Sequence, residues 1–98
     1  MSVPALYWNR VIFQVPGWNF QTALGIASNA LTHVGLTNIH TQSADVYAVT
    51  PSMIIAVGVV APGDNIYVLV VMAAGNNASE VKTMVGNVFN YLKSQTPL

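Results

Sequence analysis

Cysteine is absent from this sequence and charge is scarce, and each absence removes whole classes of function. Without cysteine the chain has no disulfide, no thiolate metal site and no cysteine nucleophile, although this does not identify its cellular compartment. Charged residues make up 6% of the chain, and three basic and three acidic residues give a formal net charge of zero. The three cations, Arg10, Lys82 and Lys93, are scattered. We therefore expect no nucleic-acid binding, which requires clustered positive charge.

Apolar stretches long enough to span a membrane are also missing. A transmembrane helix needs about 18 to 20 successive apolar residues, and the two apolar runs at 53–60 and 66–74 are each about half that length. A turn sequence, Pro62-Gly63-Asp64-Asn65, separates them. The opening residues MSVPALYWNR contain neither a basic leader nor a continuous apolar segment, so we expect no signal peptide. The sequence predicts no membrane span and assigns no localisation.

The most informative segment is the apolar hairpin that these two runs predict. With 53% apolar residues among 98, the chain is expected to form one domain, residues 1–98, around a single two-layer core. A strand that shows one face to water should alternate apolar and polar residues, and neither run does so. Both faces of this hairpin therefore need to be covered.

The other predicted elements complete a β-α-β-β-β-α order. A strand at 7–15 ends at Pro16-Gly17, and a helix follows between the N-cap Asn19 and Gly35, which is placed to adopt the left-handed conformation after the helix. Leu36 is expected to fold back on the last turn as in a Schellman motif. The next segments are a loop or irregular strand start at 37–44, a strand at 45–49, and a final helix in which Asn77 and Glu80 approximate a capping box.

This order predicts an α+β two-layer sandwich, in which two amphipathic helices cover one face of a four-stranded, mainly antiparallel sheet. If the first strand pairs with the second, the intervening helix makes a right-handed crossover and that pair is parallel. The opposite sheet face then has no cover from the same chain. Five or six aliphatic side chains on it represent on the order of 10 kcal/mol of gross stabilisation. We expect a homodimer or a larger assembly, with another protein or an apolar ligand as alternatives.

Candidates for chemistry are few. Arg10 and Asp45 have no obvious local role, and on neighbouring strands they would form a cross-strand ion pair, with ligand contact as the alternative. His33 and His40 are seven residues apart, which is not the spacing of a helical metal pair, so we expect no metal and no cofactor. The chain has no Gly-x-Ser-x-Gly elbow, phosphate loop or paired carboxylates. We predict no catalytic residue; the best remaining set is His33 or His40 with Asp45.

The leading hypothesis is a non-enzymatic interaction module that self-associates through its apolar sheet face or joins a protein complex. A second is an apolar-ligand binding protein, with the ligand between helices and sheet or on the open face. A small hydrolase or isomerase is a third. Aromatic residues suit either core packing or partner contact. The candidate ligand or partner contacts are Trp8, Arg10, Trp18, Asp45, Tyr47 and Tyr67.

Overall fold

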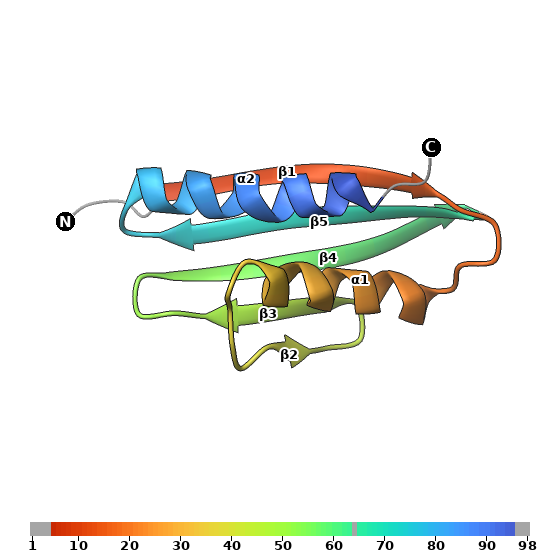
Figure 1. Ribbon diagram of the computed structural model, residues 1–98, viewed down its shortest axis with the longest axis horizontal. Coiled ribbons are helices and arrows are strands. Elements are labelled where there is room, and N and C mark those ends of the chain that lie inside the picture. Colours follow the sequence, from red (N-terminus) through yellow and green to blue (C-terminus); the bar gives the residue numbers. More distant parts are fainter. Residues whose placement is uncertain (1–4, 64, 96–98) are drawn as a thin grey trace.

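The protein is an α+β domain in which two helices lie on one face of an antiparallel sheet (Figure 1). The computed structural model describes residues 5–63 and 65–95. Within them the sheet has five strands, one more than predicted, in the order β1-β5-β4-β3-β2. The predicted fold class is confirmed. The elements are β1 (Ala5–Gln14), α1 (Phe20–His33), β2 (His40–Thr41), β3 (Asp45–Val49), β4 (Met53–Gly63), β5 (Ile66–Gly75) and α2 (Ala78–Ser94).

The position of β1 differs from the prediction. It lies beside β5 and runs antiparallel to it, from Ala5 opposite Gly75 to Gln14 opposite Ile66, so the parallel pairing with the second predicted strand is wrong. The physical reason lies in the apolar runs of β4 and β5. Beside the second predicted strand, β1 would have left β5 at an edge, whereas the observed order gives both apolar strands a neighbour on each side.

Two further boundaries differ in detail. The segment predicted as a loop or irregular strand start contains the short edge strand β2, which pairs with β3. At the hairpin, β4 continues beyond the predicted strand end to Gly63, with a register shift between Val60 and Gly63. Asp64, assigned to the turn by its sequence, lies outside the described residues. Asn65, with φ of 62°, adopts the left-handed conformation that asparagine tolerates in turns.

The ends of α1 are fixed as their sequence predicts. The Asn19 side chain accepts a hydrogen bond from the backbone N–H of Thr22 at 2.8 Å, which satisfies one free donor of the first turn. After the helix, Gly35 has φ of 91°. The N–H of Leu36 donates to the carbonyl of Leu31 at 3.1 Å, and the buried Leu36 side chain completes a Schellman motif.

The capping box of α2 is only half formed. Asn77 caps the helix by accepting from the N–H of Glu80 at 3.0 Å. The Glu80 carboxylate instead accepts a hydrogen bond from the hydroxyl of Ser52, in the turn between β3 and β4. Glu80 thus ties the start of α2 to the sheet while its charge still complements the helix dipole.

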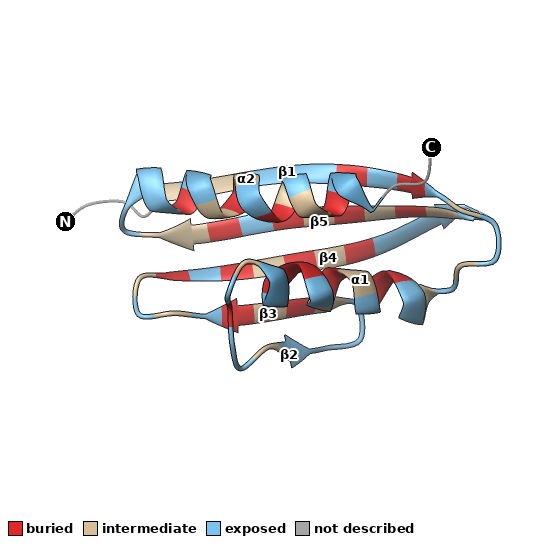
Figure 2. Ribbon diagram, in the orientation of Figure 1, coloured by how far each residue is buried: buried red, intermediate tan, exposed pale blue. Residues whose placement is uncertain are grey.

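The core lies between the helices and the sheet (Figure 2). The helix α2 packs over β1 and β5, and α1 packs over β3 and β4. Along β4 and β5 every second side chain points into this layer, so Ile55, Leu69 and Val71 are fully buried. Among the described residues, neither helix is long and apolar enough to cross a membrane.

Candidate functional site: the outer face of the sheet

The sheet face turned away from the helices, here called the outer face, is rich in exposed apolar side chains. Alternate residues of the strands point to it because their neighbours point into the core. Leu6 and Trp8 are 65% and 62% exposed, whereas Phe13 on the same strand is 1% exposed. Every large hydrophobic residue that is exposed in the described parts of the chain lies on this face. These residues are Leu6, Trp8, Ile12, Val49, Ile54, Val60 and Met72.

Directly paired residues share a face, so the strand register arranges the outer face in rows that run across the strands. Four rows cover its main part, and the pair Gln14 and Ile66 lies beyond the fourth. Row 1 consists of Leu6, Ala74, Ile54 and Val49; row 2 of Trp8, Met72, Ala56, Tyr47 and His40; row 3 of Arg10, Val70, Gly58 and Asp45; row 4 of Ile12, Val68 and Val60. Rows 1 and 4 are entirely apolar. Charge on these rows is confined to the two ends of row 3.

The six candidate contacts separate into two groups. Trp8, Arg10, Asp45 and Tyr47 lie on the outer face, in rows 2 and 3. Trp18 and Tyr67 instead belong to the helix side. The hydroxyl of buried Tyr67 donates a hydrogen bond to the carbonyl oxygen of Trp18 at 2.7 Å, and the Trp18 ring lies 5.1 Å from that of Phe13. Their contacts are those of core residues.

The predicted ion pair between Arg10 and Asp45 within one chain is wrong. It required β1 and β3 to be neighbours, and β5 and β4 lie between them. Three strand spacings separate the two residues by about 14 Å, beyond the reach of a direct contact. They nevertheless face the same way, at opposite ends of row 3.

Row 2 carries the aromatic groups of the outer face. The His40 and Tyr47 rings stack, with centroids 5.0 Å apart and an angle of 20° between their planes. This pair extends the row to β2, and Trp8 lies at its other end. The sequence predicts a polar loop at His40 and does not indicate this contact. The sequence contains no strand pattern at this point, because the two-residue strand β2 is too short to show an alternation of apolar and polar residues.

Two hollows involve residues of the outer face. One, of about 170 Å³, is lined by Leu6, Ile54, Ala56, Met72, Ala73 and Ala74. The other, of about 340 Å³, lies between β1 and α2 and is lined by Arg10, Val11, Ile12, Phe89 and Lys93. Sites for drug-sized molecules usually have volumes of about 300 to 1,000 Å³. The hollow among the apolar side chains is smaller than this range, so that part of the outer face suits a broad partner surface better than a small enclosed ligand.

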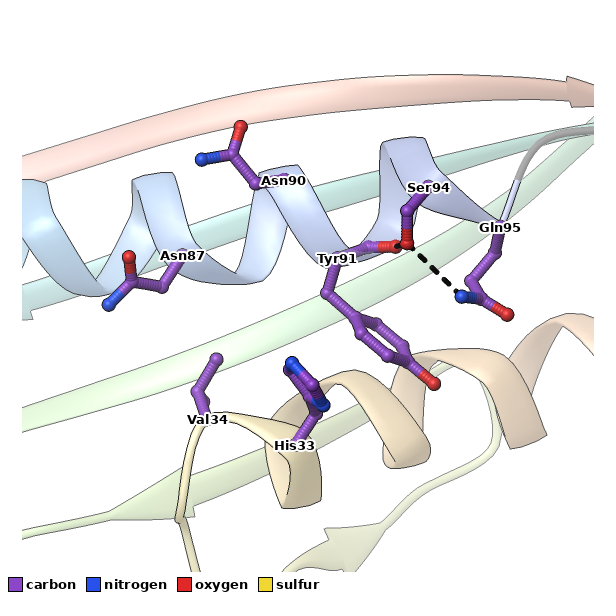
Figure 3. Close-up of a pocket in the computed structure, with 7 residues that line it drawn as sticks. All are labelled: His33, Val34, Asn87, Asn90, Tyr91, Ser94 and Gln95. Atoms are coloured by element: carbon purple, nitrogen blue, oxygen red, sulfur yellow. Dashed lines mark hydrogen bonds between the residues drawn. The ribbon is translucent and has the colours of Figure 1, made fainter.

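A separate depression lies between the two helices (Figure 3). It is a groove of about 620 Å³ in which the rings of His33 and Tyr91 stack with centroids 4.5 Å apart. Its other lining residues are Val34, Asn87, Asn90, Ser94 and Gln95. The amides and hydroxyls could hydrogen-bond a neutral polar molecule, but most of these side chains are exposed to solvent.

The arrangement offers no support for metal or acid-base chemistry. No group of three His, Cys, Asp or Glu side chains within residues 5–63 and 65–95 could hold a metal ion. His33 lies in the groove between the helices, whereas Asp45 lies on the outer face of the sheet. The fold therefore does not bring this predicted pair together. His40 shares the outer face with Asp45, but its ring stacks on Tyr47.

Comparison with known proteins adds no assignment: no protein-family model matches the chain, and no curated protein matches it at a significant level.

Proposed function

We propose that this protein is a non-enzymatic interaction module that self-associates through the outer face of its sheet. The observation that carries the proposal is the gathering of all exposed large hydrophobic residues of the described chain on that one face. Monomeric proteins rarely expose a contiguous apolar patch larger than a few hundred Å². Burying such a patch against a partner removes it from water and stabilises the complex.

The size of the outer face supports a protein partner. Four strands about 4.8 Å apart, with four outward residues about 6.8 Å apart along each strand, give roughly 500 Å² of flat sheet. A standard interface buries about 800 Å² of accessible surface on each partner. Because side chains project from the sheet, the accessible surface of the outer face is larger than its flat area and approaches this value. Two such sheets can stack face to face in an aligned packing. A second copy supplies this surface without any other component.

The charge of the chain favours association with itself. Its formal net charge is zero, so no overall repulsion opposes the approach of two copies at neutral pH. The charged residues on the four rows have opposite signs, Arg10 and Asp45. A face with charge of one sign would repel its own copy.

Sedimentation velocity of the wild-type protein and of Met72→Glu tests the proposal. Met72 lies in the second row of the outer face and is 41% exposed, so glutamate at this position stays hydrated in the monomer. In the dimer it would be buried without a partner, which is costly. We expect dimers for the wild type at tens of micromolar and monomers for the variant.

The matched control is Thr83→Glu, which adds the same charge at an exposed position of α2. It should remain dimeric. A wild-type protein that sediments only as a monomer, or a Met72→Glu variant that dimerises as well as Thr83→Glu, would refute self-association through this face.

Ligand binding is the second candidate function, favoured by the volume of the groove between the helices. At about 620 Å³ the groove falls within the usual range of small-molecule sites. Native mass spectrometry of protein purified from its own host separates the two candidates. A retained ligand adds its own mass to the monomer, whereas self-association doubles the mass.

A further inference from the structure

We infer that two copies of this chain pack outer face to outer face about a two-fold axis that runs parallel to the strands, between β4 and β5. In this arrangement Arg10 of each copy faces Asp45 of the partner subunit. The inference rests on the proposed self-association and specifies its geometry.

Aligned packing leaves two symmetric ways to stack identical faces. A two-fold axis that relates facing sheets must lie in the plane between them. When the strands of the two sheets are aligned, the axis runs either along the strands or across them. An axis along the strands keeps every row opposite the same row of the partner. Centred between β4 and β5, it places β1 over the partner's β3 and β5 over the partner's β4. An axis across the strands places each strand over itself and reverses the order of the rows.

Charge favours the axis along the strands. Row 3 has Arg10 on β1 at one end and Asp45 on β3 at the other. Since this axis exchanges the positions of β1 and β3, it forms two equivalent ion pairs between the subunits. An axis across the strands leaves Arg10 over the partner's β1, where no acidic residue faces outward. It would set Arg10 against Arg10 of the partner subunit when it crosses row 3.

Side-chain size favours the same axis independently. In the first three rows, paired outward residues of β4 and β5 combine a large side chain with a small one. The pairs are Ile54 with Ala74, Ala56 with Met72, and Gly58 with Val70. The axis along the strands sets β4 over β5, so each large side chain meets a small one and the layers interdigitate. An axis across the strands that passes between rows 2 and 3 instead sets Val70 against Met72 of the partner subunit and leaves a gap between Gly58 and Ala56 of the partner subunit.

The aromatic residues agree with this geometry. In row 2, Trp8 would lie over Tyr47 of the partner subunit. Within each chain, the Tyr47 ring also stacks on the ring of His40. Aromatic pairs of this kind stabilise interfaces beyond their buried area. Both ends of row 2 would then carry the same contact.

Edge-to-edge extension of the sheet is a less suitable mode of self-association. At the β1 edge, the Asn9 side-chain oxygen accepts a hydrogen bond from the backbone N–H of Arg10 at 2.8 Å. This N–H is therefore occupied and does not pair freely with another strand. Native proteins commonly protect the edges of their sheets against strand addition.

Charge reversal tests the inferred axis. Arg10→Asp would place two carboxylates together at both ends of row 3, and Asp45→Arg would do the same with two cations. We expect each single variant to raise the dimer dissociation constant at least about tenfold, because facing like charges are strongly unfavourable. The double variant R10D/D45R restores opposite charges between the subunits, and we expect its dissociation constant to lie within about threefold of the wild-type value. Sedimentation equilibrium gives these constants, and circular dichroism confirms the fold.

Gly58→Val provides a second test with a different physical basis. A Cβ at Gly58 meets nothing within 4 Å in the monomer, so the substitution should be tolerated there. Under the inferred axis the new side chain meets Val70 of the partner subunit and weakens the dimer. Under an axis across the strands it fills the gap between small residues and strengthens the dimer.

The outcomes separate the inference from the function on which it rests. A wild-type monomer at tens of micromolar overturns both. A wild-type dimer whose R10D/D45R variant remains as weak as the single variants overturns the axis and leaves self-association standing. A dimer strengthened by Gly58→Val also contradicts the axis. Restoration by R10D/D45R together with weakening by Gly58→Val supports the inferred dimer.

Discussion

Two adjacent isoleucines on β4 show how differently the two faces of this sheet are treated. Ile55 points toward the helices and is fully buried, whereas Ile54 points outward and is 47% exposed. Their chemistry is the same. Residue type therefore does not distinguish the inner and outer faces of these strands, because both carry aliphatic side chains. What distinguishes the faces is their cover: α1 and α2 supply it on one side only.

Shortening each of these two side chains should lower the free energy of unfolding to very different extents. Ile55→Ala should lower the free energy of unfolding by about 2 to 5 kcal/mol, because it removes buried contacts and leaves a cavity. Ile54→Ala should lower it by less than about 1 kcal/mol in the monomer, where the side chain is already half in water. Urea denaturation at protein concentrations below the dimer dissociation constant measures both changes in the free energy of unfolding. Equal losses would contradict the contrast between the faces.

A smaller effect is expected from the same change at two glycines. A Cβ at Gly75 would collide with the backbone oxygen of Ser52 and crowd Met53 and Val81, so Gly75→Ala should destabilise the fold by about 1 to 3 kcal/mol. Gly58→Ala meets open space on the outer face and should not destabilise the monomer. Thermal unfolding of both variants at low protein concentration provides the comparison. Destabilisation by Gly58→Ala as large as that by Gly75→Ala would show that the outer face is already packed in the monomer.

Local signals in the sequence predicted much of this fold. Asn19 and Gly35 fixed the ends of α1 because capping and left-handed backbone are properties of single residues and their neighbours. The class of fold followed from the order of helical and extended patterns. The uncovered sheet face followed from two helices being available for a sheet whose central strands are apolar on both faces.

Strand order could not be read from local signals in the same way. The placement of β1 depends on a contact between segments about 60 residues apart, and the preference for right-handed crossovers favoured the wrong neighbour. The apolar runs of β4 and β5 do indicate the observed order, because strands that are apolar on both faces belong at the centre of a sheet.

The candidate site was predicted in part. Trp8, Arg10, Asp45 and Tyr47 were named, and the structure places all four on the outer face. The relation between Arg10 and Asp45 depends on strand order, so it emerged only from the register. The sequence predicts a contact between them within one chain, whereas the register places them at opposite ends of one row.

Fluorine NMR of protein labelled with 5-fluorotryptophan tests whether a second copy covers the outer face. The two tryptophans report on the two sides of the sheet, Trp8 on the outer face and Trp18 among core residues. A Trp8→Phe variant assigns the resonances. We predict that dilution from tens of micromolar through the dimer dissociation constant shifts the Trp8 resonance toward that of a solvent-exposed indole and leaves the Trp18 resonance unchanged. A Trp8 resonance that stays at its solvent-exposed position across the whole series would contradict the account.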